Sequence, residues 1–404
     1  MGKLQQVIIA VNNFSLGILL PVLNLVLMER GATLQTLPLL VGIYSVTVLC
    51  LELPSGVCAD IYGRKMIFLM STVFMLMSFS LLIMANSMGW LIFAMIFFGM
   101  GRAFSSGSLD ALFIEQAIDL HGECCLAGVT ARISILESVG LAVGAIAGGI
   151  IANATGTYLT NIVVRLVLTA ILFILCLFFV KEQPLHGKSH HTTLMEHVKQ
   201  GKQVLTSVHE LGFVFIGVFF LGFLFFTVET YWQPAFMQMS NTQESTWMLG
   251  FITFIGFFSV AFGNTIVKKI LDKYINKWWN VYNICRIVFA GCIVIFAIQK
   301  NSISFVVCYA FIYMALGASN LAESALINKF TQNHMRASML SLNSLVVQIG
   351  SLCASLFSSI MILKLQFAGL WIVAGVLLGG YAVISIAVIN KYNQKNRNNT
   401  TVIP

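Results

Sequence analysis

Long apolar runs follow one another along the whole chain, separated by short polar connections. A membrane-spanning helix needs about 20 mostly apolar residues, and on that rule the sequence predicts twelve spans. The pattern therefore predicts an all-α membrane protein. The expected spans cover residues 5–28, 36–57, 67–86, 89–113, 127–152, 159–181, 210–232, 246–267, 279–298, 302–325, 337–360 and 367–390.

One connection is much longer than the others and divides the spans into six and six. We therefore expect an N-terminal six-helix bundle over 1–181, a cytoplasmic linker over 182–209, a C-terminal six-helix bundle over 210–390 and a cytoplasmic tail over 391–404. Within the linker, apolar residues recur near helical spacing among charged ones, which predicts an amphipathic helix lying on the inner leaflet. Its five histidines fit a solvated polar segment better than a metal sensor.

The distribution of basic residues predicts the orientation in the membrane. Of the 404 residues, 58% are hydrophobic and 9% are charged, as in a polytopic membrane protein. With both termini in the cytoplasm, the connections on the outer side carry only Arg30, Lys300 and Lys364, and all other basic residues outside the spans face inward. The net charge of +8 is thus a topology signal and not a nucleic-acid patch.

Several classes of site are not expected. The segment Gly187-Lys188-Ser189 resembles part of a phosphate-binding loop, but Glu182 stands where such a loop needs glycine, so no ATP site is predicted. The nine cysteines lie in or beside apolar helices or in one short loop, without zinc-site spacing, and we expect reduced packing residues, no metal and no cofactor.

Ionisable residues inside the predicted spans are candidates for function, since each costs about 2.5–3.5 kcal/mol to insert at the centre of a membrane helix. Arg102 and Glu137 lie near the middle of the fourth and fifth spans, and Glu52 and Asp110 lie closer to the inner face. A carboxyl group held near a guanidinium can bind a proton in one geometry and release it in another. The other interpretation of Arg102 and Glu137 is a static ion pair that holds two helices together.

Other embedded charges lie closer to the membrane surfaces. For these residues, an anchoring role at helix ends or with lipid headgroups is expected as much as a role in transport. Glu323 lies toward the inner face, Glu229 and Arg165 lie toward the outer face, and Arg132 and Arg286 occupy the inward third of their spans.

A charged turn joins the second and third spans. Gly56, Asp60, Gly63, Arg64 and Lys65 fall in the order Gly-x-x-x-Asp-x-x-Gly-Arg-Lys, with glycines that permit a tight turn. This segment resembles the loop between the second and third helices of the major facilitator superfamily. The resemblance implies the major facilitator fold and a latch on the inner side, in which Asp60 faces the N-terminus of the eleventh helix near Arg336.

Two further patterns resemble the exporters of that superfamily. Gly140, Gly144, Gly148 and Gly149 match its antiporter signature, with Ala145 where the family has proline. Small residues on one face also serve plain close packing. Arg102 resembles the fourth-helix arginine that the family links to proton transfer, and Glu52 before Pro54 resembles a variant found in Gram-positive tetracycline and multidrug pumps.

Four aromatic side chains are candidates for a substrate pocket. Phe223 and Phe226 belong to a phenylalanine-rich seventh span, and Tyr309 and Tyr313 lie one turn apart in the tenth. They can line a pocket for flat, apolar, cationic molecules, although packing in the core or against lipid is the more frequent role of such residues.

These observations predict a secondary active transporter of the cell membrane and not an enzyme. Its expected partners are a small-molecule substrate, protons and the lipid bilayer, and the expected activity is drug:proton antiport. A proton-coupled symporter for a nutrient or metabolite is the alternative within transport, and a non-transporting membrane sensor or scaffold is the alternative from another class.

Overall fold

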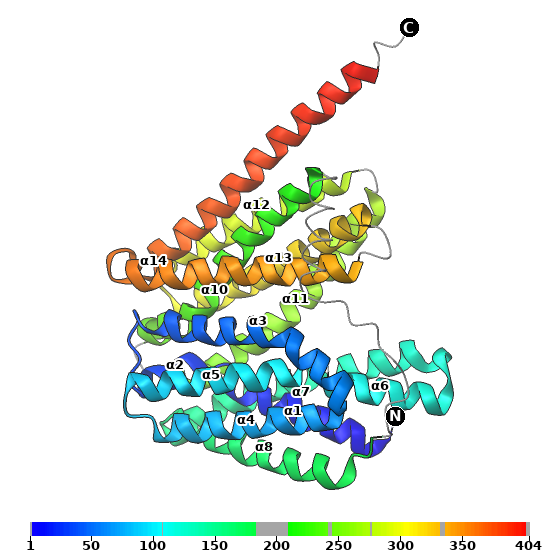
Figure 1. The fold of residues 1–404 in the computed structure, drawn as a ribbon. Helices are drawn as coiled ribbons and strands as arrows, with labels where there is room; N and C mark the ends of the chain where they lie inside the picture. Colours follow the sequence, from blue (N-terminus) through cyan, green and yellow to red (C-terminus); the bar gives the residue numbers. More distant parts are fainter. Residues whose placement is uncertain are drawn as a thin grey trace. The chain divides into compact units, whose positions relative to one another are not determined.

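The computed structural model describes residues 2–106, 108–182, 209–240, 245–274, 277–331 and 336–400. Every regular element in these ranges is helical (Figure 1). The first half contains α1 (Lys3–Leu19), α2 (Leu23–Glu29), α3 (Leu37–Tyr62), α4 (Arg64–Met84), α5 (Met88–Ser105), α6 (Ser108–His121), the 3₁₀ turn η1 (Glu123–Cys125), α7 (Leu126–Thr155) and α8 (Leu159–Phe179). The second half contains α10 (His209–Ser240), α11 (Trp247–Lys273), α12 (Trp278–Ala297), α13 (Ser302–Phe330) and α14 (Arg336–Thr400).

The described helices agree with the predicted spans. Nine of them are long and apolar enough to cross a membrane, or ten if the bent pair α1 and α2 forms one span. The apolar part of α3, Leu37–Glu52, is a shorter candidate. The continuous helix α14 contains a break at Gln366, where φ is 54° and ψ is −173°, so it supplies two of the predicted segments. The predicted amphipathic helix of the linker lies outside the described residues.

A break in the first span is stabilised by polar side chains. Helices α1 and α2 meet at 50° beside Pro21, which cannot donate a backbone hydrogen bond. The Nε2 atom of Gln233, in α10, donates to the carbonyl oxygen of Leu20 over 3.0 Å. Asn24 donates from its backbone nitrogen to Oε1 of Gln233 over 3.3 Å and from Nδ2 to the Thr230 carbonyl oxygen over 3.1 Å. Backbone groups that the break leaves without helical partners are thereby satisfied inside a buried contact.

The chain forms two compact units. One comprises Met1–His191 and Thr230–Phe257, and the other comprises Thr192–Glu229 and Phe258–Pro404. In the first unit α1 packs on α7, and α5 packs between α3 and α4. In the second unit α12 packs against α13 and α14. The domain boundaries expected from the sequence stay a prediction.

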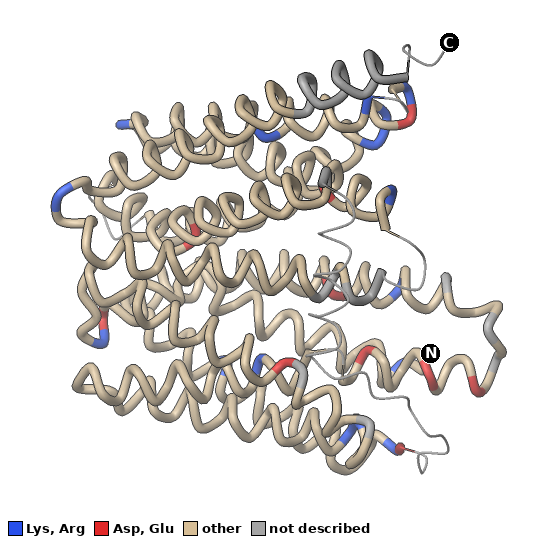
Figure 2. Tube along the Cα trace, turned by 45° about the horizontal axis from the view of Figure 1, so that its top comes forward, with Lys and Arg blue, Asp and Glu red and all other residues tan. Residues whose placement is uncertain are grey.

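Charged residues concentrate at helix ends and connections, and the middles of the helices are almost free of them (Figure 2). This distribution is expected for helices that cross a hydrocarbon layer, where an exposed charge is costly. The few charged residues along the helices are therefore candidates for functional roles.

Candidate functional site

The charged turn of the sequence motif lies between α3 and α4 and depends on Gly63. This residue has φ of 94°, a conformation that favours glycine. A Cβ atom at this position would also lie 2.6 Å from Oε2 of Glu182. Gly56, which we expected to contribute to the turn, lies instead inside α3, two turns before its end. The turn therefore rests on Gly63 alone.

The motif residues after Gly63 join three helices of the first unit. The Glu182 carboxylate accepts hydrogen bonds from the backbone nitrogens of Arg64, over 2.6 Å, and Lys65, over 3.1 Å, so it caps the first turn of α4. The Arg64 guanidinium contacts Glu115 of α6 over 2.6 Å, and Lys65 Nζ donates to the Leu177 carbonyl oxygen of α8 over 2.9 Å. Sequence reasoning gave Glu182 and Glu115 no role, because a cap from a residue more than a hundred positions away leaves no local signal.

The other half of the expected latch stays a prediction. Asp60 lies in the last turn of α3 and Arg336 begins α14. Their side chains are outside the described part of the chain, so the contact between Asp60 and the eleventh span is not described.

Three of the four expected proton-coupling residues come together in the first unit. Asp110 of α6 and Glu137 of α7 are close enough for a hydrogen bond between their carboxyl groups, and Arg102 of α5 acts electrostatically on both. We call Asp110 and Glu137 the acid pair. A hydrogen bond between two carboxyl groups needs a proton on one of them. Both side chains are half-buried, whereas Arg102 is exposed in the last turn of α5.

Glu52 has a different neighbour. Its side chain is exposed on α3 and acts electrostatically on Tyr44, about two turns earlier in the same helix. Arg102 also acts electrostatically on Tyr44. Tyr44 thus links Arg102 to α3.

Arg165 of α8 is a buried cation that sequence reasoning placed among the shallow charges. Its side chain is only 5% exposed, and its guanidinium carbon lies 4.8 Å from the ring centre of Phe79 and 5.4 Å from that of Phe98. Tyr44 and Arg102 act on it electrostatically, and within the described residues it forms no ion pair with a carboxylate. A buried cation without a carboxylate is costly, which makes Arg165 a functional candidate in its own right.

The glycines of α7 bring that helix unusually close to its neighbours. A Cβ atom at Gly140 would lie 2.9 Å from the Ala10 carbonyl oxygen, and one at Gly144 would lie 2.9 Å from Gly17 Cα, both on α1. A Cβ atom at Gly149 would lie 2.7 Å from the Trp247 carbonyl oxygen of α11. Gly148 makes the same kind of backbone contact with Ile18. The close packing predicted from these small residues is present.

A second ionic site lies within the second unit. Arg286 of α12 forms a salt bridge with Glu323 of α13, with side-chain exposures of 0% and 5%. The guanidinium lies 5.1 Å from the Tyr282 ring centre, and the carboxyl group also interacts with the Asn343 side chain. Among the described residues, Nε and Nη1 of Arg286 have no hydrogen-bond partner. Both charges were candidates, but their pairing was not predicted.

The aromatic residues proposed for a pocket are largely packed together in the second unit. The Tyr309 ring stacks on Tyr313 with centres 4.4 Å apart, and Phe223 contacts Phe357 at 5.5 Å. Phe223, Phe226 and Tyr309 are at most 7% exposed. Their role as a substrate pocket stays a prediction.

Known families and proteins resemble this chain over most of its length. The family model described as Major Facilitator Superfamily matches residues 7–350 and 248–402. The chain is 23% identical over 376 residues to the uncharacterized MFS-type transporter YxaM of Bacillus subtilis (strain 168), with 91% of each chain covered. It is 22% identical over 340 residues to the uncharacterized transporter BU466 of Buchnera aphidicola subsp. Acyrthosiphon pisum (strain APS), with 84% of each covered.

Solved structures share the fold at low sequence identity. The nucleoside transporter NupG superposes with a TM-score of 0.78 at 13% identity, over 97% of this chain and 99% of that one. A POT family transporter in complex with a thioalcohol-conjugated peptide gives a TM-score of 0.72 at 13% identity, over 96% of both chains. Because the family model spans nearly the whole chain and the helical architecture agrees with it, this protein belongs to the major facilitator superfamily and is a membrane transporter of that type.

Proposed function

We propose that this protein is a proton-coupled secondary active transporter that exports amphipathic small molecules in exchange for protons. The observation that carries the proposal is the acid pair: Asp110 and Glu137 lie in contact within membrane-spanning segments, with Arg102 beside them. Two carboxyl groups at such close range resist ionising together, because like charges in a medium of low polarity repel strongly. One proton shared between them removes that repulsion.

Arg102 makes the state of the acid pair dependent on geometry. When its guanidinium approaches the two carboxyl groups, it favours their ionised form and releases the proton. When it turns away from them toward Tyr44, on which it also acts electrostatically, the shared proton is retained. A change in helix positions that moves Arg102 between these partners would therefore load or unload a proton.

Antiport follows if the substrate and the proton compete for the acid pair. A cationic amphipathic molecule is attracted to the ionised pair and displaced when a proton neutralises it. The α7 glycines support the same proposal, since the helix that carries Glu137 lies in backbone contact with α1 and α11 and can shift without side chains interlocking. Drug efflux and an antibiotic-resistance role are the corresponding proposals at the level of the cell.

Transport by reconstituted protein tests the proposal. Proteoliposomes with a pH-sensitive dye inside would be offered ethidium, tetracycline or uridine, and wild type is expected to couple uptake of one of them to proton movement. Glu137→Gln and Asp110→Asn should retain substrate exchange but lose proton movement. Asp272→Asn, at an exposed carboxylate near the end of α11, is the matched control and should behave as wild type. Coupled proton movement that survives in both single variants and in the double variant would contradict the assignment.

Arg165 favours a second candidate function, proton-coupled uptake of an anionic metabolite. A buried guanidinium next to Tyr44 and Arg102 supplies positive potential that an anionic substrate would neutralise. A proton on the acid pair would free Arg102 to join in binding that anion, so proton and substrate would move together. The dye assay separates the two functions, because a given substrate gradient drives protons in opposite directions in antiport and symport.

The orientation is also a proposal. The inward excess of basic residues supports a plasma-membrane location with both termini in the cytoplasm. Labelling of single cysteines by a membrane-impermeant thiol reagent in intact cells tests it. A cysteine introduced at Lys300 should react, whereas one introduced at Lys3 should react only after permeabilisation. The reverse pattern would contradict the orientation.

A further inference from the structure

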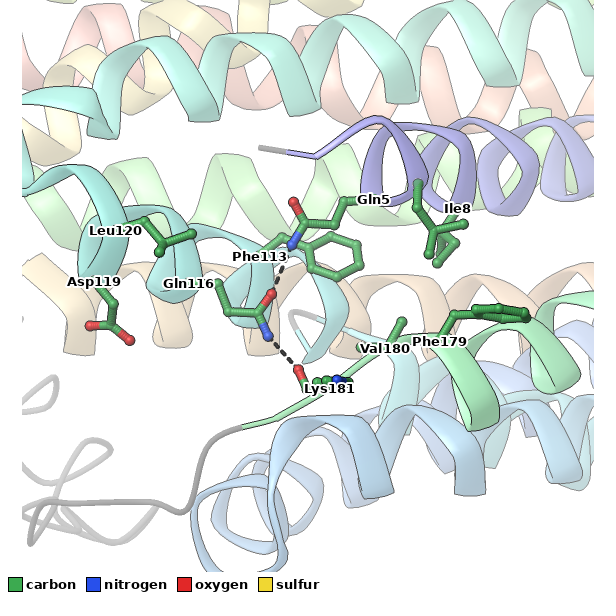
Figure 3. Close-up of a pocket in the computed structure, with 10 residues that line it drawn as sticks. Gln5, Ile8, Phe113, Gln116, Asp119, Leu120, Phe179, Val180 and Lys181 are labelled. Atoms are coloured by element: carbon green, nitrogen blue, oxygen red, sulfur yellow. Dashed lines mark hydrogen bonds between the residues drawn. The ribbon is translucent and has the colours of Figure 1, made fainter.

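An amphipathic pocket lies at one end of the first unit, between α1, α6 and the segment that follows α8 (Figure 3). Its volume is about 300 Å³. The pocket shares no residue with the acid pair or with the charged turn. Its apolar walls are formed by Leu4, Ile8, Phe113, Leu120, Phe179 and Val180.

The floor of the pocket is a chain of side-chain amides. Nε2 of Gln5 donates to Oε1 of Gln116 over 2.7 Å, and Nε2 of Gln116 donates to the Lys181 carbonyl oxygen over 2.6 Å. These bonds connect the first turn of α1, the middle of α6 and the chain just after α8. The floor is therefore polar and held in place, while the walls above it are apolar.

Two opposite charges border this floor. Asp119 and Lys181 both line the pocket, and Figure 3 shows them on either side of Gln116. Both side chains are exposed, and within the described residues neither takes part in an ion pair. A ligand that carries a positive and a negative group could therefore be bound at both ends without removing a partner from either residue.

The pocket lies where two spans end. Leu120 ends the candidate span Met88–Leu120 and Phe179 ends the candidate span Leu159–Phe179. The two residues are 77% and 60% exposed. Charged residues next to the ends of spans sit at the level of the lipid headgroups, and exposed apolar residues beside them face the acyl chains. The pocket thus lies at the depth where the headgroup of a phospholipid meets its acyl chains.

We propose that this pocket binds the headgroup of a zwitterionic aminophospholipid. Lys181 pairs with the lipid phosphate, Asp119 accepts hydrogen bonds from the primary ammonium group, and the walls near Leu4 and Phe179 receive the start of the acyl chains. A purely anionic headgroup would satisfy Lys181 but would be repelled by Asp119. A quaternary ammonium carries the same charge but has no N–H to donate to a carboxylate, so a primary amine binds better.

Binding at this pocket reaches the acid pair through α6. Phe113 lines the pocket and lies one helical turn from Asp110 on the same helix. A bound lipid would hold α6 against α1, the helix that packs on α7 and its Glu137. The lipid site itself does not depend on the proposed function, but this effect on proton coupling rests on it.

Lipid retention by the purified full-length protein tests the site. Delipidated protein in detergent would be given an equimolar mixture of phosphatidylethanolamine, phosphatidylcholine and phosphatidylglycerol with identical acyl chains, and bound lipid would be counted by native mass spectrometry. Wild type should retain phosphatidylethanolamine about tenfold better than either competitor. Equal retention of all three lipids, a preference for phosphatidylglycerol, or no retained lipid would overturn the proposal.

Two variants separate the two halves of the headgroup. Asp119→Asn should abolish the preference for phosphatidylethanolamine over phosphatidylcholine, and Lys181→Gln should lower retention of both about tenfold. Asp272→Asn and Lys364→Gln, at exposed charges that do not line the pocket, are the matched controls and should bind as wild type. An unchanged preference in Asp119→Asn would refute the ammonium contact. Normal lipid selectivity without proton-coupled transport would count against the proposed function and leave the site standing.

Discussion

Removing the carboxyl group of Glu323 should destabilise the protein more than most single substitutions do, because it leaves the buried guanidinium of Arg286 without its ionic partner. Arg286 has a fully buried side chain, and Glu323 is its ionic partner. In Glu323→Leu the guanidinium loses this partner while Nε and Nη1 are already without hydrogen bonds to described residues. Breaking a buried pair by deleting one member costs about 3–5 kcal/mol. The Tyr282 ring, 5.1 Å away, offsets part of this cost, since a desolvated cation–π contact contributes about 2 kcal/mol.

A double substitution distinguishes the loss of the pair from the loss of packing. Arg286→Met with Glu323→Leu removes both charges and keeps similar volume, and replacing a buried pair in this way is often neutral or stabilising. We expect the double variant to unfold within about 1 kcal/mol of wild type, and each single variant to be about 3 kcal/mol less stable. Unfolding in mixed micelles with increasing dodecyl sulfate, followed by circular dichroism, measures all four proteins.

Two outcomes would contradict the view that Arg286 and Glu323 act as a buried pair. If the double variant were as unstable as the sum of the two single variants, the side chains would not act as a pair. If Glu323→Leu lost less than about 1 kcal/mol, Arg286 would have access to water, because an accessible charge loses little when its partner is removed.

Three further substitutions test the first unit by the same unfolding assay. Gly144→Val should cost about 1–3 kcal/mol or prevent folding, because its side chain would meet the α1 backbone, whereas Gly128→Val on the same helix meets open space and should fold normally; equal stability of the two would contradict the close packing. Glu182→Gln should cost about 1 kcal/mol through the weakened α4 cap, more than Glu115→Gln at an exposed ion pair, and the reverse order would refute the cap. Gln233→Leu should cost about 1–3 kcal/mol because it removes both amide contacts at the break between α1 and α2, and an unchanged midpoint would show that water satisfies those backbone groups.

The hydrophobic pattern predicted the spans well because a helix must be apolar over the full thickness of the hydrocarbon layer. The run expected at 159–181 corresponds to α8 at Leu159–Phe179, and the run at 67–86 corresponds to α4 at Arg64–Met84. Helix ends were less predictable. Helices α3 and α13 continue past the predicted runs to Tyr62 and Phe330, since polar residues outside the apolar core can extend a helix without a change of composition.

The candidate site was predictable residue by residue, but the pairings were not. Spans that are apolar on all sides lack the polar face that would show how each helix is rotated. Arg286 and Glu323 were therefore recognised as separate candidates, and only the packing of α12 on α13 brings them together. Asp110 and Glu137 lie on different helices for the same reason. The aromatic surroundings of Arg165 left no signal in the sequence, because α8 brings no aromatic residue within one turn of it.

Helix α6 connects three features of the first unit that lie far apart in the sequence, so a movement of this helix affects all three. Within its fourteen residues it carries Asp110 of the acid pair, Glu115, which pairs with Arg64 after the charged turn, and Gln116 of the pocket floor. Asp110 and Asp119 are nine residues apart, or about 13 Å along the helix axis, so a helix that moves as one body cannot reposition one end without the other. A shift that separates Asp110 from Glu137 must therefore also strain the contact between Arg64 and Glu115 or the amide chain at Gln116. Proton binding, the charged turn and lipid binding would then compete for the position of one short helix, so substituting Arg64 or Lys181 should change the pH dependence of transport even though neither residue touches the acid pair.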